Sequence, residues 1–201
     1  MHIDVSKLIG KYVFLEKLLP GHKELIRSIA RDERIWEFNR MMLVNDTYDK
    51  QYDDYFAVAS DPRGRGEQHA FVIYKTNTQE IIGMTRFYEL DEKNKRVAIG
   101  YTWYIPSVWK RVYNKECKLL LLQYAFEEMK FNRVEFTVAS QNIRSQKAVE
   151  KIGGVKEGVL RKNAYRNDGT QTDTVVFSII NDEWPVKKEK LLQLIAESEN
   201  D

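Results

Sequence analysis

Short runs in which apolar and polar residues alternate predict the first strand of the chain. Residues 12–18 (YVFLEKL) alternate in this way, and Pro20-Gly21 ends the run before a helix expected at residues 22–31. Asp46-Thr47 is suited to cap a second helix, because these side chains accept backbone N–H groups at helix starts. One face of that helix is apolar at three- and four-residue spacing and is expected in the core; it carries Tyr48, Tyr52, Tyr55, Phe56 and Ala59.

Three further runs with the pattern of strands follow closely. They cover residues 70–75, 80–90 and 96–105 and are rich in β-branched and aromatic residues. The polar turn DEKNK at 91–95 joins the last two. This part of the chain therefore predicts an antiparallel meander.

The longest apolar helix pattern covers residues 114–130. Its stripe consists of Cys117, Leu120, Leu121, Tyr124 and Ala125, and Leu119, Leu122 and Phe126 widen it almost around the helix. Such a helix is expected to be largely buried. Residues 133–139 then read as a strand, and a strand, a helix of this length and another strand predict a crossover between parallel strands.

The last part of the chain predicts a helix, a hairpin and a tail. The helix begins at Asn142, a good cap, and ends at Gly153-Gly154. Residues 155–161 and 172–180 read as a hairpin around an Asp168-Gly169 turn, and a lysine-rich helical segment follows Pro185. We expect a mixed α/β (α+β) fold with a mostly antiparallel sheet, one domain at residues 1–185 and a helical tail at 186–201.

Composition removes several function classes. Lys and Arg exceed Asp and Glu by two in 201 residues, which gives nucleic-acid binding no support. Cys117 is the single cysteine, and the three histidines are scattered without metal-ligand spacing, so no metal site is expected. The opening MHIDVSKLIG has no apolar run long enough for a signal sequence or membrane span. A cytoplasmic protein without a membrane partner is expected.

Several motifs resemble the RimJ/RimL branch of the GNAT (GCN5-related) N-acetyltransferases. They are IGYTWYIPSVW, NKECKLLLLQYAFE, RVEFTVASQNIRSQKAVEKIGG, KEGVLR and DTVVFSIINDEW, and the resemblance covers about residues 8–185. It implies a sheet splayed around the crossover helix. It also implies transfer of an acetyl group from acetyl-CoA to a primary amine, either a protein N-terminus or a small amine, by direct attack in a ternary complex. The protein would be a monomer or a homodimer.

The resemblance places the cofactor phosphates at the start of the helix at 114–130. Helix N-termini suit anions because their N–H groups are free and the helix dipole is positive there. The family loop is W-G-x-G, but Lys110 and Val112 stand at the two glycine positions, and side chains restrict positive φ. Cations either compensate by contacting phosphate or are solvated. The residues concerned are Lys110, Arg111, Val112, Tyr113, Asn114 and Lys115.

Catalytic roles are likewise implied by the resemblance. The oxyanion donor is a backbone N–H at a bulge near the end of the strand at 96–105, which maps to Trp103, Tyr104 and Ile105. The tyrosine that often protonates the CoA thiolate is Val149 here, so Ser145 is the candidate acid; alternatively it is a structural first-turn residue. Asn142 is expected to cap its helix and to contact the pantetheine arm.

The general base is the least defined part. Family members with a ribosomal-protein substrate carry a glutamate where this chain has Ala164, and Glu89 is a candidate substitute, beside a water chain or an amine of low pKa. Trp36, Tyr48 and Tyr52 lie in the region that walls the acceptor site in the family. Glu135, Glu157 and Arg161 match family positions in strands where salt bridges are expected. The alternative function is a non-catalytic acyl-CoA-binding or regulatory module that keeps the fold.

Overall fold

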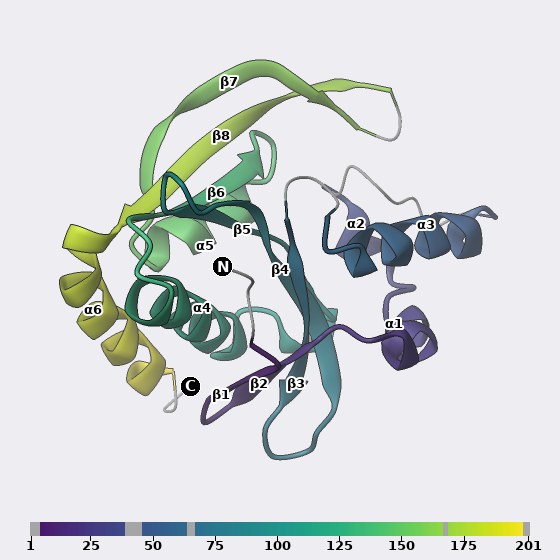
Figure 1. The fold of residues 1–201 in the computed structure, drawn as a ribbon. Helices are drawn as coiled ribbons and strands as arrows, with labels where there is room; N and C mark the ends of the chain where they lie inside the picture. Colours follow the sequence, from purple (N-terminus) through teal and green to yellow (C-terminus); the bar gives the residue numbers. More distant parts are fainter. Residues whose placement is uncertain (1–4, 39–45, 64–66, 167–168, 199–201) are drawn as a thin grey trace.

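The computed structural model describes residues 5–38, 46–63, 67–166 and 169–198. In these ranges the strands form one eight-stranded sheet in the order β1-β2-β3-β4-β5-β6-β8-β7 (Figure 1). All neighbours are antiparallel except β5 and β6, which confirms the expected mixed sheet. The strands are β1 (Lys7–Ile9), β2 (Val13–Lys17), β3 (His69–Lys75), β4 (Ile81–Asp91), β5 (Arg96–Tyr104), β6 (Arg133–Ala139), β7 (Val155–Tyr165) and β8 (Gln171–Ile180).

Helices cover both faces of the sheet. In Figure 1, α1 (Lys23–Ile29), α2 (Glu33–Trp36) and α3 (Tyr48–Ser60) lie on one side of β2–β5, and α4 (Tyr113–Gln123) and α6 (Trp184–Glu197) lie on the other. Each face has its own apolar core. The predicted apolar face of α3 is buried, as expected. Thr47 stands at the cap position of α3, but its side chain makes no capping hydrogen bond, so the predicted cap is wrong in mechanism.

The central feature for function is the parallel pair of β5 and β6. The two strands pair only at their first residues, from Arg96 with Arg133 to Ala98 with Glu135. Beyond Ala98 they diverge, and β5 continues to Tyr104 while β6 continues to Ala139 beside β8. The crossover helix α4 connects them, which confirms the expected splayed sheet and leaves a gap between the carboxyl ends of the two strands.

The crossover helix is not α-helical throughout. Its α-helical part ends at Gln123, and a π-helical turn at Tyr124–Glu128 completes the range predicted as one helix. Cys117, Leu121 and Ala125 are fully buried, as the apolar stripe predicted. The helix therefore anchors the sheet on the side opposite α3.

The C-terminal part confirms the predicted helix and hairpin. Helix α5 (Ile143–Lys151) is capped by Asn142, and Gly153 follows it with a φ of 97° that favours glycine. Strand β7 runs four residues beyond the predicted end at Arg161, while Asp168 of the predicted turn lies outside the described residues. The tail helix starts at Trp184, and its buried residues join the core beside α4.

Candidate active site

The backbone at the end of β5 has one N–H group directed into the gap. The Ile105 N–H donates to the Ile82 carbonyl of β4 at 2.9 Å. Bonded and non-bonded pairs alternate along an antiparallel ladder, so Tyr104, which pairs with Gly83, directs its N–H away from β4. On that side β6 has already diverged. The Tyr104 carbonyl accepts a hydrogen bond from the Trp109 indole at 2.8 Å, which fixes the orientation of this peptide.

The expected bulge in β5 lies slightly before the predicted position. The pairing changes register between Gly100 and Trp103, where Thr85 alone lies opposite Tyr101 and Thr102. Tyr101 takes a φ of 51°, the left-handed conformation that accommodates the additional residue. The bulge is therefore at Tyr101-Thr102 rather than at Trp103, Tyr104 and Ile105, and the last three form regular pairs with β4 or its continuation.

The loop before α4 keeps a glycine-like conformation without a glycine. Lys110 takes a φ of 64°, which glycine adopts without strain and which costs a lysine about 1 kcal/mol. Val112, at the second glycine position, has an ordinary φ of −61° and forms the N-cap of α4 without a side-chain hydrogen bond. The start of α4 therefore keeps backbone N–H groups that no capping side chain occupies.

The charged residues around this helix start have different environments. Lys110 and Arg111 are exposed, while Tyr113 and Asn114 are partly buried. Lys115 donates from its Nζ to the Ser198 hydroxyl at the end of α6, so it is held against that helix. Lys110 and Arg111 remain as the exposed cations beside the helix start.

Glu116 is a buried residue of this region that sequence reasoning missed. Its side chain is 5% exposed, and its carboxylate accepts the backbone N–H groups of Lys11, Tyr12 and Val13 at 2.8, 2.6 and 2.7 Å. The carboxylate thereby joins the first turn of α4 to the β1–β2 turn. Because three N–H groups solvate its charge, the carboxylate is directed away from the free helix start.

The start of α5 forms the opposite side of the gap. The Asn142 side chain accepts the Ser145 N–H at 3.0 Å, which confirms the predicted cap. Ser145 is partly buried in the first helical turn, whereas Val149 is 7% exposed and packs beside Gly154. The Arg144 guanidinium lies 4.1 Å from the centre of the Trp109 ring. This contact brings the α5 start close to the loop that precedes α4.

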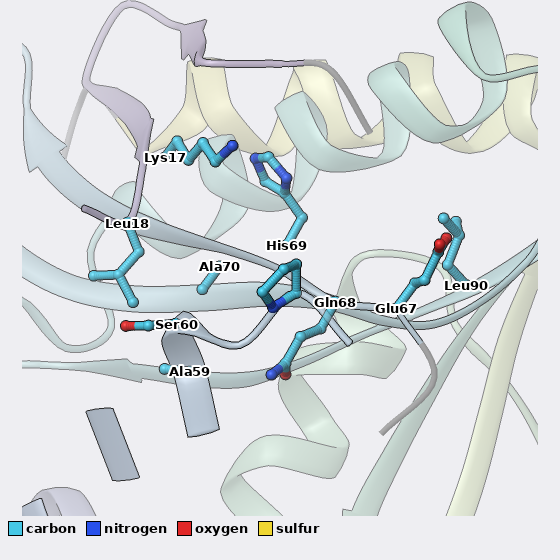
Figure 2. A pocket seen from close by; sticks show the side chains of 10 residues that line it. Lys17, Leu18, Ala59, Ser60, Glu67, Gln68, His69, Ala70 and Leu90 are labelled. Carbon is cyan, nitrogen blue, oxygen red and sulfur yellow. The ribbon is translucent and has the colours of Figure 1, made fainter. Parts of the chain in front are cut away.

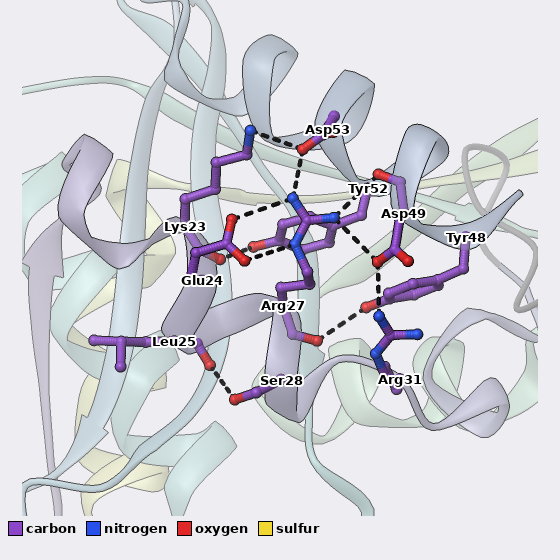
Figure 3. A network of polar contacts seen from close by, with 10 residues as sticks. All are labelled: Lys23, Glu24, Leu25, Arg27, Ser28, Arg31, Tyr48, Asp49, Tyr52 and Asp53. Carbon is purple, nitrogen blue, oxygen red and sulfur yellow. Dashed lines mark hydrogen bonds and ion pairs between the residues drawn. The ribbon is translucent and has the colours of Figure 1, made fainter.

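The N-terminal aromatic residues are core residues. Tyr48 and Tyr52 are buried and donate their hydroxyls to the carbonyls of Arg27 and Lys23 in α1. Burial raises the pKa of Tyr48 to about 12 and that of Tyr52 further. Figure 3 shows Arg27 between Glu24, Asp49 and Asp53, an ion-pair network that joins α1 to α3. Both tyrosines therefore face α1.

Trp36 is also buried. Its indole donates to the Ala30 carbonyl at 2.6 Å, and its ring lies 5.6 Å from the ring of Trp103 at the end of β5. Of the three predicted wall residues, Trp36 is the one that contacts the strand at the gap.

The predicted base lies at the other end of the sheet. Glu89 is exposed, with a φ of 51°, and follows Tyr88, which pairs with Ala98 where β5 and β6 are still joined. Six residues of strand, about 20 Å, separate Ala98 from Tyr104. The contacts of the described residues do not bring Glu89 to Ser145 or Tyr104. Ala164 lies on β7 opposite Thr172, which also leaves no carboxylate at that position.

The expected strand salt bridges are present for two of three residues. Arg133 contacts Glu157 at 2.6 Å and Glu135 at 2.8 Å. The hydrogen bond from Arg133, together with one from the Ser178 hydroxyl, lowers the pKa of Glu157 to about 2. Arg161 is exposed on β7.

A buried lysine contacts the bulge from the α4 side. Lys118 is 6% exposed, and its Nζ donates to the Thr102 hydroxyl at 2.7 Å, which lies 2.8 Å from the hydroxyl of Thr85. Burial lowers the pKa of Lys118. A charged residue inside an almost wholly apolar helix pattern was the signal that could have drawn attention to it.

A cavity of about 220 Å³ lies away from the gap, at the end of α3 (Figure 2). It contains none of the predicted site residues, and its lining consists of Lys17, Leu18, Ala59, Ser60, Pro62, Glu67, Gln68, His69, Ala70 and Leu90. In the ranges that the structure describes, no cluster of three or more His, Cys, Asp and Glu residues could hold a metal ion. No helix there is long and apolar enough to cross a membrane.

Known proteins share both sequence and fold with this chain. The N-acetyltransferase YoaA of Bacillus subtilis (strain 168), named as uncharacterized, is 36% identical over 108 residues, or 54% of this chain and 60% of that protein. The protein named "Putative ribosomal N-acetyltransferase YdaF", from the same organism, is 34% identical over 108 residues, or 54% of this chain and 58% of that protein. The chain thus spans about 60% of the length of these curated relatives.

A solved structure covers almost all of the chain. This "putative acetyltransferase", from T. thermophilus, is 30% identical, superposes with a TM-score of 0.84, and covers 96% of this chain and 98% of its own. The family model described as "Acetyltransferase (GNAT) domain" matches residues 13–155, which include the meander, the gap and both helix starts. The chain therefore belongs to the GNAT acetyltransferase domain family.

Proposed function

We propose that the protein is an acetyl-CoA-dependent N-acetyltransferase of the RimJ/RimL branch that acetylates a primary amine. The observation that carries the proposal is the gap between β5 and β6, with the Tyr104 N–H directed into it and two helix starts beside it. Such a gap admits an extended ligand along the free edge of β5. The carboxyl ends of diverging strands are where α/β proteins commonly bind ligands.

Each part of acetyl-CoA has candidate contacts. The start of α4, with Lys110 and Arg111, would hold the phosphates, and Asn142 would contact the pantetheine arm while it caps α5. The left-handed Lys110 supports this assignment, because the loop keeps the conformation that brings its backbone close to the helix start. Trp103, Val112, Tyr113, Asn114, Lys115 and Ile105 complete the proposed binding region.

Transfer would proceed by direct attack of the neutral amine on the thioester carbonyl. A C–N bond forms, and the C–S bond breaks when the tetrahedral intermediate collapses. The Tyr104 N–H is the proposed donor to the oxyanion, and the Ser145 hydroxyl would donate a proton to the departing thiolate. The amine proton would pass to Glu89 through water, or to water alone.

The acceptor is a protein N-terminus or a small amine, and the name of the relative YdaF favours a ribosomal protein. The alternative is a non-catalytic acyl-CoA-binding module. Val149 and Ala164, neither of which carries a proton-transferring group, are the observations that favour it.

Calorimetry with acetyl-CoA, followed by a free-thiol release assay over N-terminal peptides and small amines, tests the proposal. We expect binding and amine-dependent thiol release. Failure to bind acetyl-CoA at low salt and millimolar concentration would overturn the assignment. Binding without thiol release for any amine would establish the non-catalytic alternative.

A further inference from the structure

Arg86 of β4 is a buried cation that the proposed chemistry does not use. Its side chain has no exposed surface, although Arg is among the residues least often buried without a partner. The guanidinium carbon lies 4.8 Å from the ring centre of Tyr55 on α3 and 4.6 Å from that of Tyr101 in the β5 bulge. Two tyrosine rings thus hold the group on the α3 side of the sheet.

The hydrogen bonds of Arg86 are incomplete. Its Nη1 lies 3.4 Å from the Gln68 side-chain oxygen, a long contact with a neutral amide. The Gln68 side-chain nitrogen donates to the carbonyls of Val58 and Asp61 at the end of α3, so its oxygen is held toward Arg86. Among the described residues, neither Nε nor Nη2 of Arg86 has a hydrogen-bond partner. Buried guanidinium N–H groups without partners are costly, so their retention calls for an explanation.

The two unpartnered atoms define the chemistry that would complete them. The Nε–H and Nη2–H groups form one edge of the guanidinium and point in parallel, the geometry that binds both oxygens of a carboxylate. With tyrosine rings against the group and Gln68 at Nη1, this edge is what remains for a ligand. We propose that Arg86, Tyr55 and Tyr101 form a binding site for a carboxylate group of the acceptor substrate.

The proposed carboxylate site is continuous with the end of β5. The Trp103 indole donates to the Tyr55 hydroxyl at 3.0 Å, and Tyr101 and Trp103 flank the register change of the same strand. The site therefore adjoins the residue before Tyr104, whose N–H is the proposed oxyanion donor. Because Tyr101 is partly exposed and Arg86 is not, entry of a carboxylate requires the Tyr101 ring to move. The substrate class, an amine that also carries a carboxylate, rests on the proposed acetyl transfer.

A thermal-stability measurement tests the site without any acetyl transfer. Sodium glutarate, compared with sodium chloride at equal ionic strength, should raise the melting temperature of the wild-type protein by about 2–4 °C near saturation. Arg86→Met should abolish this rise, because methionine fills a similar volume without the N–H groups. Arg86→Lys, which keeps the charge but loses the paired edge, should also abolish it and serves if the methionine variant fails to fold.

The matched control is Arg96→Met, which removes an exposed arginine of the neighbouring strand that pairs with Asp91. This variant should keep the full response to glutarate. An equal rise in wild type and both Arg86 variants, or no rise in the wild type, would overturn the carboxylate site.

Acetyl transfer then tests the substrate class. The probes are unbranched ω-amino acids of increasing length, each beside its carboxamide counterpart. We expect kcat/KM to favour the best carboxylate by about tenfold or more, and Arg86→Met to remove that preference. Equal rates for acid and amide would refute the substrate class while leaving the acetyltransferase proposal intact. Absence of transfer to every amine would refute the acetyltransferase instead, and the glutarate response would still decide the carboxylate site.

Discussion

The guanidinium of Arg144 lies 4.1 Å from the centre of the Trp109 ring, and this contact joins the two sides of the gap. Trp109 is itself fixed by its hydrogen bond to the Tyr104 carbonyl, and Arg144 occupies the first turn of α5. Loop, strand end and helix start are therefore linked through one side-chain pair. Cation–π contacts of this kind contribute about 0.5–1 kcal/mol at exposed sites.

We predict that Arg144→Met weakens acetyl-CoA binding about fivefold, because it removes both the contact and a cation near the proposed phosphate site. Calorimetry at two salt concentrations measures the effect, and the variant should also show a smaller loss of affinity with salt. Lys147→Met, which removes an exposed cation from the next turn of α5, is the control. Equal losses in both variants would mean that net charge alone sets the affinity.

Glu116→Ala should lower the free energy of unfolding by about 2–4 kcal/mol. The change leaves three backbone N–H groups of the β1–β2 turn without their buried acceptor. Urea denaturation measures it, with Glu128→Ala, at an exposed position near the end of the same crossover segment, as the control. A loss no larger than that of the control would show that water replaces the carboxylate without cost.

The regular elements could be predicted from sequence because they depend on local patterns. Alternation defined the central strands, and Asn142 with Gly153 defined the ends of α5. The four residues of α2 and the three of β1 are too short to generate a period, so they were missed. Strand β7 continues beyond Arg161 because β8 pairs with it, which its own residues do not indicate.

The site could be predicted only where a motif carries it. Asn142, Ser145 and the loop before α4 followed from the resemblance. The contacts of Glu116 did not, because its partners lie as far as 105 positions away in the chain. The sequence shows Arg86 only as one residue of a strand, since its environment depends on Tyr55, Gln68 and Tyr101 from three other segments.

Comparison of Lys110→Gly with Lys110→Ala separates backbone strain from charge. Both variants lose the cation, but only glycine takes a φ of 64° without strain. We expect the glycine variant to be more stable than the alanine variant by about 1 kcal/mol in urea denaturation, and both to bind acetyl-CoA with a weaker salt dependence than wild type. Equal stability of the two variants would contradict a strained lysine.

Glu157→Gln tests the ion pair with Arg133 through pH. The hydrogen bond from Arg133 lowers the pKa of Glu157 from 4.5 to about 2, so the carboxylate stabilises the fold above pH 4.5. That contribution is lost as pH falls from 4.5 toward 2, because the folded state must then be protonated. Urea denaturation of wild type and variant should therefore differ at pH 7 and converge near pH 2. Glu150→Gln, at an exposed position on α5, should show no such convergence.

Ser145→Ala is expected to slow acetyl transfer about a hundredfold, the lower end of general acid catalysis, because a CoA thiol is a fairly good leaving group. The substitution removes the hydroxyl but keeps the backbone N–H that donates to Asn142, so the α5 cap and the affinity for acetyl-CoA should change little. Single-turnover transfer at saturating acetyl-CoA measures the rate once an acceptor is known, and thermal melting checks the fold. Ser28→Ala, which removes an exposed α1 hydroxyl bonded to the Leu25 carbonyl, is the control and should keep the wild-type rate. If Ser145→Ala also keeps it, the hydroxyl has no role in protonating the thiolate, and water must supply that proton.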